Sequence, residues 1–171
     1  MRIAVARESD TGEPRVAATP ETVKKFKALG ADVMVARGAG IASGVPDAEF
    51  EAAGATVGEN VTKDADVVLK VRRPAPNELK DYKKGALVVA IMDPYGNEAA
   101  LKQMADAGLV AFAMELMPRI TRAQSMDVLS SQANLAGYRA VIDAAEEYGR
   151  ALPMMMTAAG TVPARCSKCS R

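Results

Sequence analysis

Short apolar runs alternate with amphipathic segments along the first two thirds of the chain. Apolar runs of this length, bounded by polar turns, are typical of buried strands. Five such strands are predicted, over 2–6, 31–37, 66–71, 86–92 and 109–114. The segments between them carry helix signals, such as Thr19-Pro20 ahead of the spaced residues Val23, Phe26 and Leu29. The alternation predicts an α/β fold with a mostly parallel sheet and helices on both faces.

Weaker patterns predict further elements. A short helix is expected to start at Pro46-Asp47, a short strand at Ala55–Val57, a polar helix at Asn77–Lys84 and a helix at Glu98–Ala107. From about Val128 to Arg150 the spacing is helical. In this helix Leu135, Tyr138, Ile142 and Ala145 form an apolar stripe.

Polar and charged residues follow several of the predicted strands. Arg15, Lys70, Asp93 and Arg119 lie in or just after strands. Because loops after parallel strands meet at the carboxyl edge of the sheet, we expect these four residues to line one cleft. Arg15 is equally compatible with a surface position beside a helix cap, and Lys70 with a side chain that reaches solvent from an apolar strand.

The loop from Arg119 to Ser130 combines polar side chains with apolar neighbours ahead of a helix. Arginine suits a pyrophosphate or a carboxamide, and Gln124, Asp127 and Ser130 suit ribose hydroxyls and amides. The alternative is a capping loop in which Ser125 or Ser130 caps the helix and Asp127 occupies its first turn. Spacing alone slightly favours the cap.

Composition narrows the chemistry. The chain has 171 residues, 25 % of them charged, and a net charge of +1, so nucleic-acid binding is not expected. The apolar runs are far shorter than the roughly 20 residues of a transmembrane helix, and the N-terminus does not resemble a secretory signal. These features predict a soluble, cytoplasmic protein.

No metal site is expected. The chain has no histidine, and Cys166 and Cys169 alone cannot supply the four ligands of a zinc site. The glycines of Gly38–Gly44 are spaced G-x-G-x-x-x-G, which is not the dinucleotide fingerprint G-x-G-x-x-G. Because the chain has no histidine, any reaction must use other side chains or a bound cofactor.

The residues MELMPRITRAQSMDVLSSQANLAGYRAVIDAA, starting at Met114, and the later LPMMMTAAGTVPA resemble the NAD(H)-binding component of proton-translocating transhydrogenases. That component belongs to the alanine dehydrogenase/transhydrogenase superfamily. RIAVARESDTGEPRVAATPETVKKFKALG and DVVLKVRRP also fit the superfamily, so the resemblance covers about residues 1–165. It implies a flavodoxin-like or Rossmann-like first domain.

The resemblance also implies an activity and partners. Hydride would pass from NADH to NADP+, which a separate NADP(H)-binding component holds, and a separate membrane domain would translocate protons. Arg119, Gln124, Asp127 and Ser130 match the loop that contacts NAD(H) and the partner. Arg119 and Ser130 would orient the carboxamide and a phosphate, Gln124 would reach the partner's nucleotide, and Asp127 would hold the carboxamide or the loop. No catalytic acid or base is implied.

Two alternatives stay open. Alanine dehydrogenases share the N-terminal pattern, and Arg15 and Lys70 match their keto-acid-binding positions. That family uses a histidine near the strand that here ends at Asp93, where this chain reads IMDPYGN. The second alternative is a non-catalytic remnant or dimerisation module.

The family pattern predicts three segments. Residues 1–128 form the family's N-terminal domain, 129–150 a long connecting helix, and 151–171 the start of an NAD-binding domain with an aberrant tail, CSKCSR. We therefore expect a truncated or frameshifted product that binds NAD(H) weakly or not at all alone. We also expect a homodimer, and a location on the cytoplasmic side of the inner membrane, held there by the complex.

Overall fold

A computed structural model describes residues 1–148, 155–158 and 160–162 of the chain. The chain divides into two compact units, Met1–Gln124 and Ser125–Arg171. Cys166 and Cys169, with the rest of the CSKCSR tail, lie outside the described residues.

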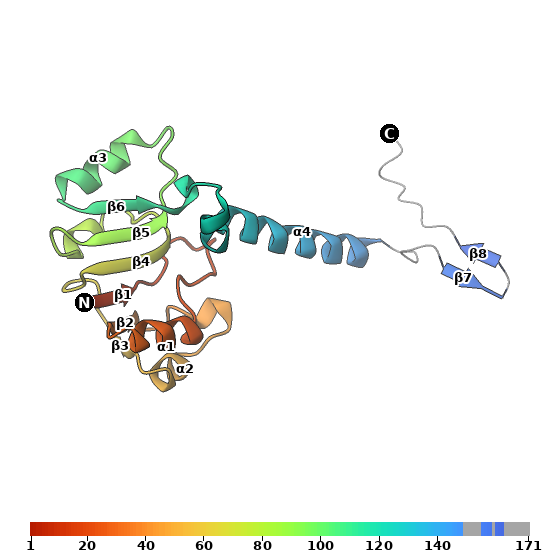
Figure 1. Ribbon diagram of the computed structural model, residues 1–171, viewed down its shortest axis with the longest axis horizontal. Helices are drawn as coiled ribbons and strands as arrows, with labels where there is room; N and C mark the ends of the chain where they lie inside the picture. Colours follow the sequence, from red (N-terminus) through yellow and green to blue (C-terminus); the bar gives the residue numbers. More distant parts are fainter. Residues whose placement is uncertain (149–154, 159, 163–171) are drawn as a thin grey trace. The chain divides into compact units, whose positions relative to one another are not determined.

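The first unit is built on a six-stranded sheet whose strand order is β3-β2-β1-β4-β5-β6 (Figure 1). Every described pairing in this sheet is parallel. The strands are β1 (Arg2–Val5), β2 (Asp32–Ala36), β3 (Thr56–Gly58), β4 (Val67–Arg72), β5 (Leu87–Ile91) and β6 (Val110–Ala113). The α/β class and the parallel sheet predicted from the apolar runs are confirmed.

The strand order combines the two doubly wound patterns. Five strands, β2-β1-β4-β5-β6, follow the flavodoxin-like order, and the three-residue strand β3 extends the sheet beyond β2. With β3 included, the order is 3-2-1-4-5-6, as in Rossmann folds. In both descriptions the winding reverses between β1 and β4, and the switch point lies at their carboxyl ends.

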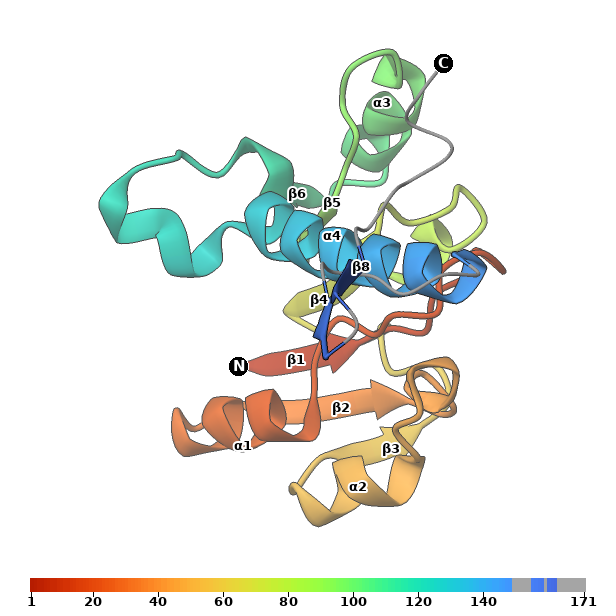
Figure 2. The same ribbon diagram turned by 90° about the vertical axis from the view of Figure 1, so that its right-hand side faces the viewer.

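Three α-helices connect strands of the sheet: α1 (Pro20–Ala28), α2 (Asp47–Ala52) and α3 (Glu98–Asp106). Thr19 caps α1 by accepting a hydrogen bond from the Thr22 amide, as the Thr-Pro start signal predicts. Both views place α1 and α2 at the β2–β3 end of the sheet and α3 at the β5–β6 end (Figure 2).

Two hydrophobic cores lie on opposite faces of the sheet, because successive strand residues point to opposite sides. In β1, Ile3 and Val5 belong to the core under α1 and α2, whereas Ala4 belongs to the core under α3. Phe50 of α2 and Met104 of α3 are the largest helical side chains buried in the two cores.

The first of these faces continues across β4, β5 and β6 as a less covered apolar surface. In register across the strands, Leu69 pairs with Val89 and Val89 with Phe112. Leu69 and Val89 are half-buried, and Phe112 is 45 % exposed. Among the described residues of the first unit, the helices that cover this face contact β2 and β3.

The polar helix predicted over Asn77–Lys84 is wrong. The structure has only a 3-10 turn, η2 (Leu79–Asp81), after which Tyr82 is extended. Leu79 is buried, whereas Lys80, Lys83 and Lys84 are solvated, so a longer helix would have no apolar stripe to bury. The connection from β3 to β4 also lacks a helix, so the strand–helix repeat is less regular than its sequence pattern predicts.

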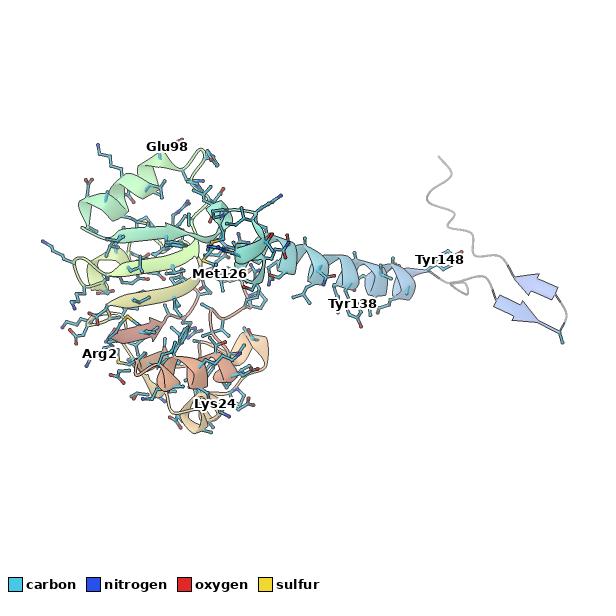
Figure 3. The ribbon with its side chains drawn as sticks, in the orientation of Figure 1. Arg2, Lys24, Glu98, Met126, Tyr138 and Tyr148 are labelled. Atoms are coloured by element: carbon cyan, nitrogen blue, oxygen red, sulfur yellow. The ribbon has the colours of Figure 1, made fainter. Side chains whose placement is uncertain are left out.

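The second unit contains the helix α4 (Val128–Glu147) and a hairpin of β7 (Met155–Thr157) and β8 (Gly160–Val162). The helix agrees with the spacing from Val128, although Arg150 lies outside the described residues. The antiparallel hairpin was not predicted, because its strands are only three residues long. Tyr138, 69 % exposed, extends from the side of α4 (Figure 3). None of the helices described in the two units is long and apolar enough to cross a membrane.

The loss of stability on truncating two phenylalanines should distinguish the covered part of the sheet from the less covered part. Phe50→Ala removes a fully buried ring and is expected to destabilise the protein by about 3–5 kcal/mol. Phe112→Ala should cost clearly less, because this ring keeps 45 % of its exposure. Urea unfolding of the two variants measures the difference, and equal losses would show that Phe112 is covered in solution.

Candidate functional site

The carboxyl ends of β1, β4 and β5 border two adjoining cavities. The larger, about 610 Å³, is lined by residues that follow these three strands, among them Arg72, Arg73 and Asp93. The smaller, about 430 Å³, includes Arg15 and Gly38 in its lining. Residues 8–10 line both. The cavities therefore lie at the switch point, where open α/β sheets bind ligands.

The expectation that Arg15, Lys70, Asp93 and Arg119 line one cleft is wrong. Asp93 lines the larger cavity and Arg15 the smaller. Of the residues that the structure describes, neither Lys70 nor Arg119 is part of either lining. The side chain of Lys70 is only 1 % exposed, because it points from β4 toward carboxylates rather than toward solvent.

Lys70 is held by two glutamates. Its Nζ donates to both oxygens of Glu78, at 3.0 and 2.9 Å, and lies 3.9 Å from a Glu8 oxygen. Glu8 also accepts hydrogen bonds from the backbone amides of Val71 and Arg72, at 2.7 and 3.3 Å. A buried ammonium needs such partners, because an unpaired charge in the interior is strongly unfavourable.

Glu13 holds two arginines. The Nε and Nη2 atoms of Arg15 each donate to a Glu13 oxygen at 2.6 Å, and the Nε of Arg72 donates at 3.0 Å. Arginine forks fit carboxylates in this two-bonded way. Hydrogen bonds from Arg15 lower the pKa of Glu13 to about 2, and Glu13 in turn raises the pKa of Arg15.

Three carboxylates and three cations thus meet at this edge, and their formal charges cancel. The carboxylates are Glu8, Glu13 and Glu78, and the cations are Lys70, Arg15 and Arg72. Burial raises the pKa of Glu8, because desolvation outweighs its hydrogen bonds and Lys70. We call these six residues the edge network. It ties the loop after β1 to the end of β4.

A second set of bonds closes the end of β5. Asp93 has a φ of +46°, in the left-handed region that only a few non-glycine residues adopt. Arg73 donates to the carbonyl oxygens of Met92 and Asp93, and Glu115 accepts hydrogen bonds from the amides of the same two residues. Asn97 donates to the Asp93 carbonyl at 3.0 Å. The backbone at Asp93 is therefore held from several sides.

The predicted nucleotide loop spans both units. In the first unit, Arg119 and Gln124 are exposed, while Ala123 is buried and anchors the 3-10 turn η4 (Thr121–Met126). In the second unit, Asp127 caps α4 by accepting from the Ser130 amide at 3.0 Å, and the Ser130 hydroxyl donates to Asp127 at 2.6 Å.

The structure brings Asp127 and Ser130 together and reverses their expected capping roles. Asp127 is the cap and Ser130 lies in the first turn, whereas the capping alternative had Ser125 or Ser130 as the cap. An aspartate suits this place because its carboxylate complements the helix dipole. The pair leaves Ser130 exposed at the start of the helix.

Sequence reasoning missed four carboxylates that organise the edge: Glu8, Glu13, Glu78 and Glu115. One signal was available, since a lysine inside an apolar strand requires a buried carboxylate, and the loop after β1 is rich in acidic residues. No pattern pointed to Glu115. Within the described residues, no acidic or cysteine cluster is arranged to hold a metal ion.

Replacing Glu13 should weaken the acid dependence of stability. The folded-state pKa of about 2 lies below the ordinary 4.5, so ionised Glu13 stabilises the fold above pH 4.5 and this stabilisation disappears as the pH falls toward 2. Because Arg15 and Arg72 are partly solvated, we expect a contribution on the order of 2 kcal/mol.

Urea unfolding of Glu13→Gln between pH 7 and 3 tests this. The variant should be less stable at pH 7 and should approach the wild type as the pH falls. Glu21→Gln, on the solvated face of α1, is the control and should keep the wild-type pH profile. A Glu13→Gln profile parallel to the wild type would contradict the assignment.

Comparison with known proteins places this geometry in a family. The model of the alanine dehydrogenase/PNT N-terminal domain matches residues 4–136. An NAD(P) transhydrogenase alpha-subunit protein of Rhodospirillum rubrum is 49 % identical, over 95 % of this chain and 44 % of that protein. Alanine dehydrogenase 1 of Staphylococcus aureus is 32 % identical, over 83 % of this chain and 38 % of that protein.

Solved structures agree. The crystal structure of transhydrogenase from Sinorhizobium meliloti superposes with a TM-score of 0.90 at 67 % identity, over 96 % of this chain and 50 % of that one. An L-alanine dehydrogenase gives a TM-score of 0.64 at 29 % identity, over 67 % of this chain and 32 % of that one. The chain spans less than half the length of the curated relatives it matches. From the matched domain and these relatives, the chain belongs to the alanine dehydrogenase/PNT family.

Proposed function

We propose that the chain contributes the first domain of the NAD(H)-binding component of a transhydrogenase, which passes hydride from NADH to NADP+. The sequence identity to transhydrogenase alpha subunits is higher than that to alanine dehydrogenases, and it extends over more of the chain. The match to the transhydrogenase structure is likewise closer than the match to the alanine dehydrogenase structure.

The chain has no histidine, and this favours transhydrogenation over amino-acid oxidation. Hydride exchange between two nicotinamide rings requires no proton donor, so the protein has to position the rings and exclude water. Oxidation of an amino acid requires proton transfer at nitrogen or oxygen. At the end of β5 this chain has Asp93, whose backbone is engaged by Arg73 and Glu115.

The loop residues suit a nicotinamide nucleotide, which supplies the hydride when bound. Exposed Arg119 would bind a phosphate or the carboxamide, and exposed Gln124 would reach toward the partner's nucleotide. Asp127 holds Ser130 by two hydrogen bonds. Because the hydroxyl is the donor in its bond to Asp127, its oxygen lone pairs could accept a bond from the ligand. We assign no catalytic acid or base.

The proposal includes further parts of the assembly. Residues 1–128 would be the family's N-terminal domain, 129–150 a connecting helix, and 151–171 the start of a nucleotide-binding domain. An NADP(H)-binding component and a proton-translocating membrane component would be the partners, and the NAD(H)-binding component would act as a homodimer. The complex would hold it at the cytoplasmic side of the inner membrane.

The second candidate is an alanine dehydrogenase-type activity, favoured by the similarity to that family and by Arg15 and Lys70 at the carboxyl edge. One preparation of the assembly separates the two. Reduction of an NADP+ analogue by NADH supports transhydrogenation, whereas NADH formation that depends on alanine and NAD+ supports the alternative.

Arg119→Ala should impair nucleotide binding selectively. Loss of one charge-assisted contact is expected to raise the KM for NADH by about tenfold or more in the assembly. The matched control is Arg122→Ala, because Arg122 is also exposed and lies in the same loop. Its KM should stay within about twofold of the wild type. Equal effects of the two substitutions would mean that only the loop's net charge matters.

A further inference from the structure

Glu115 joins the carboxyl ends of β5 and β6, two neighbouring strands of the sheet. In the sequence, Glu115 lies 22 positions after Asp93. It lies in the 3-10 turn η3 (Met114–Leu116), directly after β6, and its carboxylate accepts hydrogen bonds from Met92 and Asp93 after β5. One oxygen accepts from Met92 at 3.1 Å and the other from Asp93. A carboxylate that accepts two successive amides fixes both position and orientation.

The segment whose amides Glu115 binds is also held through its carbonyl groups. Arg73, after β4, donates to the Asp93 carbonyl at 3.1 Å and to the Asn97 side chain at 3.2 Å. Asn97, at the start of α3, donates to Asp93. Groups from three segments thus hold Asp93 in a backbone conformation that is otherwise unfavourable. Glu115 is therefore bound to a backbone segment whose position is fixed.

Glu115 is half-buried and precedes Arg119 by four residues, and between Glu115 and Ala123 only Met117 is even partly buried. Leu116, Pro118, Arg119 and Ile120 are exposed, and the next buried side chain is Ala123. In the first unit the loop is thus attached at Glu115 and again at Ala123. The first attachment lies four residues before Arg119.

The same arrangement occurs at the neighbouring strands β1 and β4. Glu8, after β1, accepts hydrogen bonds from two successive amides at the end of the neighbouring strand β4. Glu8, however, is paired with the buried Lys70, whereas the described bonds of Glu115 are to backbone amides only. This contrast marks Glu115 as an attachment between strand ends rather than a partner for a buried charge.

We propose that Glu115 is a positioning residue: its two bonds to the Met92–Asp93 backbone set the starting point of the loop that carries Arg119. The role in nucleotide binding rests on the function proposed above. The attachment itself does not.

Glu115→Gln tests the attachment, because the amide keeps the shape but offers only one acceptor oxygen. Hydrogen exchange of the purified chain should become about tenfold faster at the amides of 116–123. Exchange in β4 should not change. Glu98→Gln is the matched control, since Glu98 also accepts a backbone amide near this turn but only from Gly96. It should leave exchange in 116–123 unchanged.

Glu115→Asp keeps the charge but is one methylene shorter, so intermediate exchange is expected if the Gln variant does not fold. In the assembly, Glu115→Gln should raise the KM for NADH by about tenfold with kcat within about twofold of the wild type. Restoring Glu115 should restore both readouts.

The outcomes separate this inference from the proposed function. Unchanged exchange at 116–123 in both variants overturns the attachment, whatever the assembly does. Faster exchange with an unchanged KM for NADH overturns the role in nucleotide positioning. If the variant exchanges faster but the wild-type assembly shows no transhydrogenation, the attachment is supported and the proposed function is rejected.

Discussion

The carboxyl edge of the sheet depends on one recurring interaction, a carboxylate that accepts successive backbone amides at the end of a neighbouring strand. Glu8 does this for β4 and Glu115 for β5. Parallel strands end with unpaired amides that water or a side chain must satisfy. Because glutamates from adjacent loops meet this need, the loops after β1 and β6 are fixed to the sheet they follow, and the side chains they carry are positioned with them.

At the same edge of the sheet, charged side chains are paired with one another. The edge network cancels its own charge, so its arginines and its lysine are engaged in structure, and Arg15 and Lys70 serve the fold before they serve any ligand. Arg119, Gln124 and Ser130, which are exposed, lie instead in the loop before α4 and in its first turn. In the proposed function the protein positions a cofactor and transfers no protons itself, and an edge fixed by ion pairs together with a loop of exposed side chains suits that role.

The sequence predicted the sheet well, because buried parallel strands are apolar runs, and β1, β2, β4, β5 and β6 coincide with the predicted runs to within a residue at each end. It failed where a few tertiary contacts decide the outcome. A single 3-10 turn buries Leu79, and the chain is extended at Tyr82 instead of continuing as a helix. The strands β7 and β8 are too short to detect. The candidate loop came from family resemblance, whereas Glu8, Glu13 and Glu115 act through long-range bonds that no spacing reveals.

In the function proposed for this chain, hydride passes directly between two bound nicotinamides, and the chain would hold one of them and supply no acid or base. Transfer of deuterium from NADH labelled at C4 on the reactive face tests it most directly. In the assembly, we expect the deuterium to appear in NADPH, with none lost to water. Washout of the label into solvent, or deuterated NADH that yields no labelled NADPH, would contradict it.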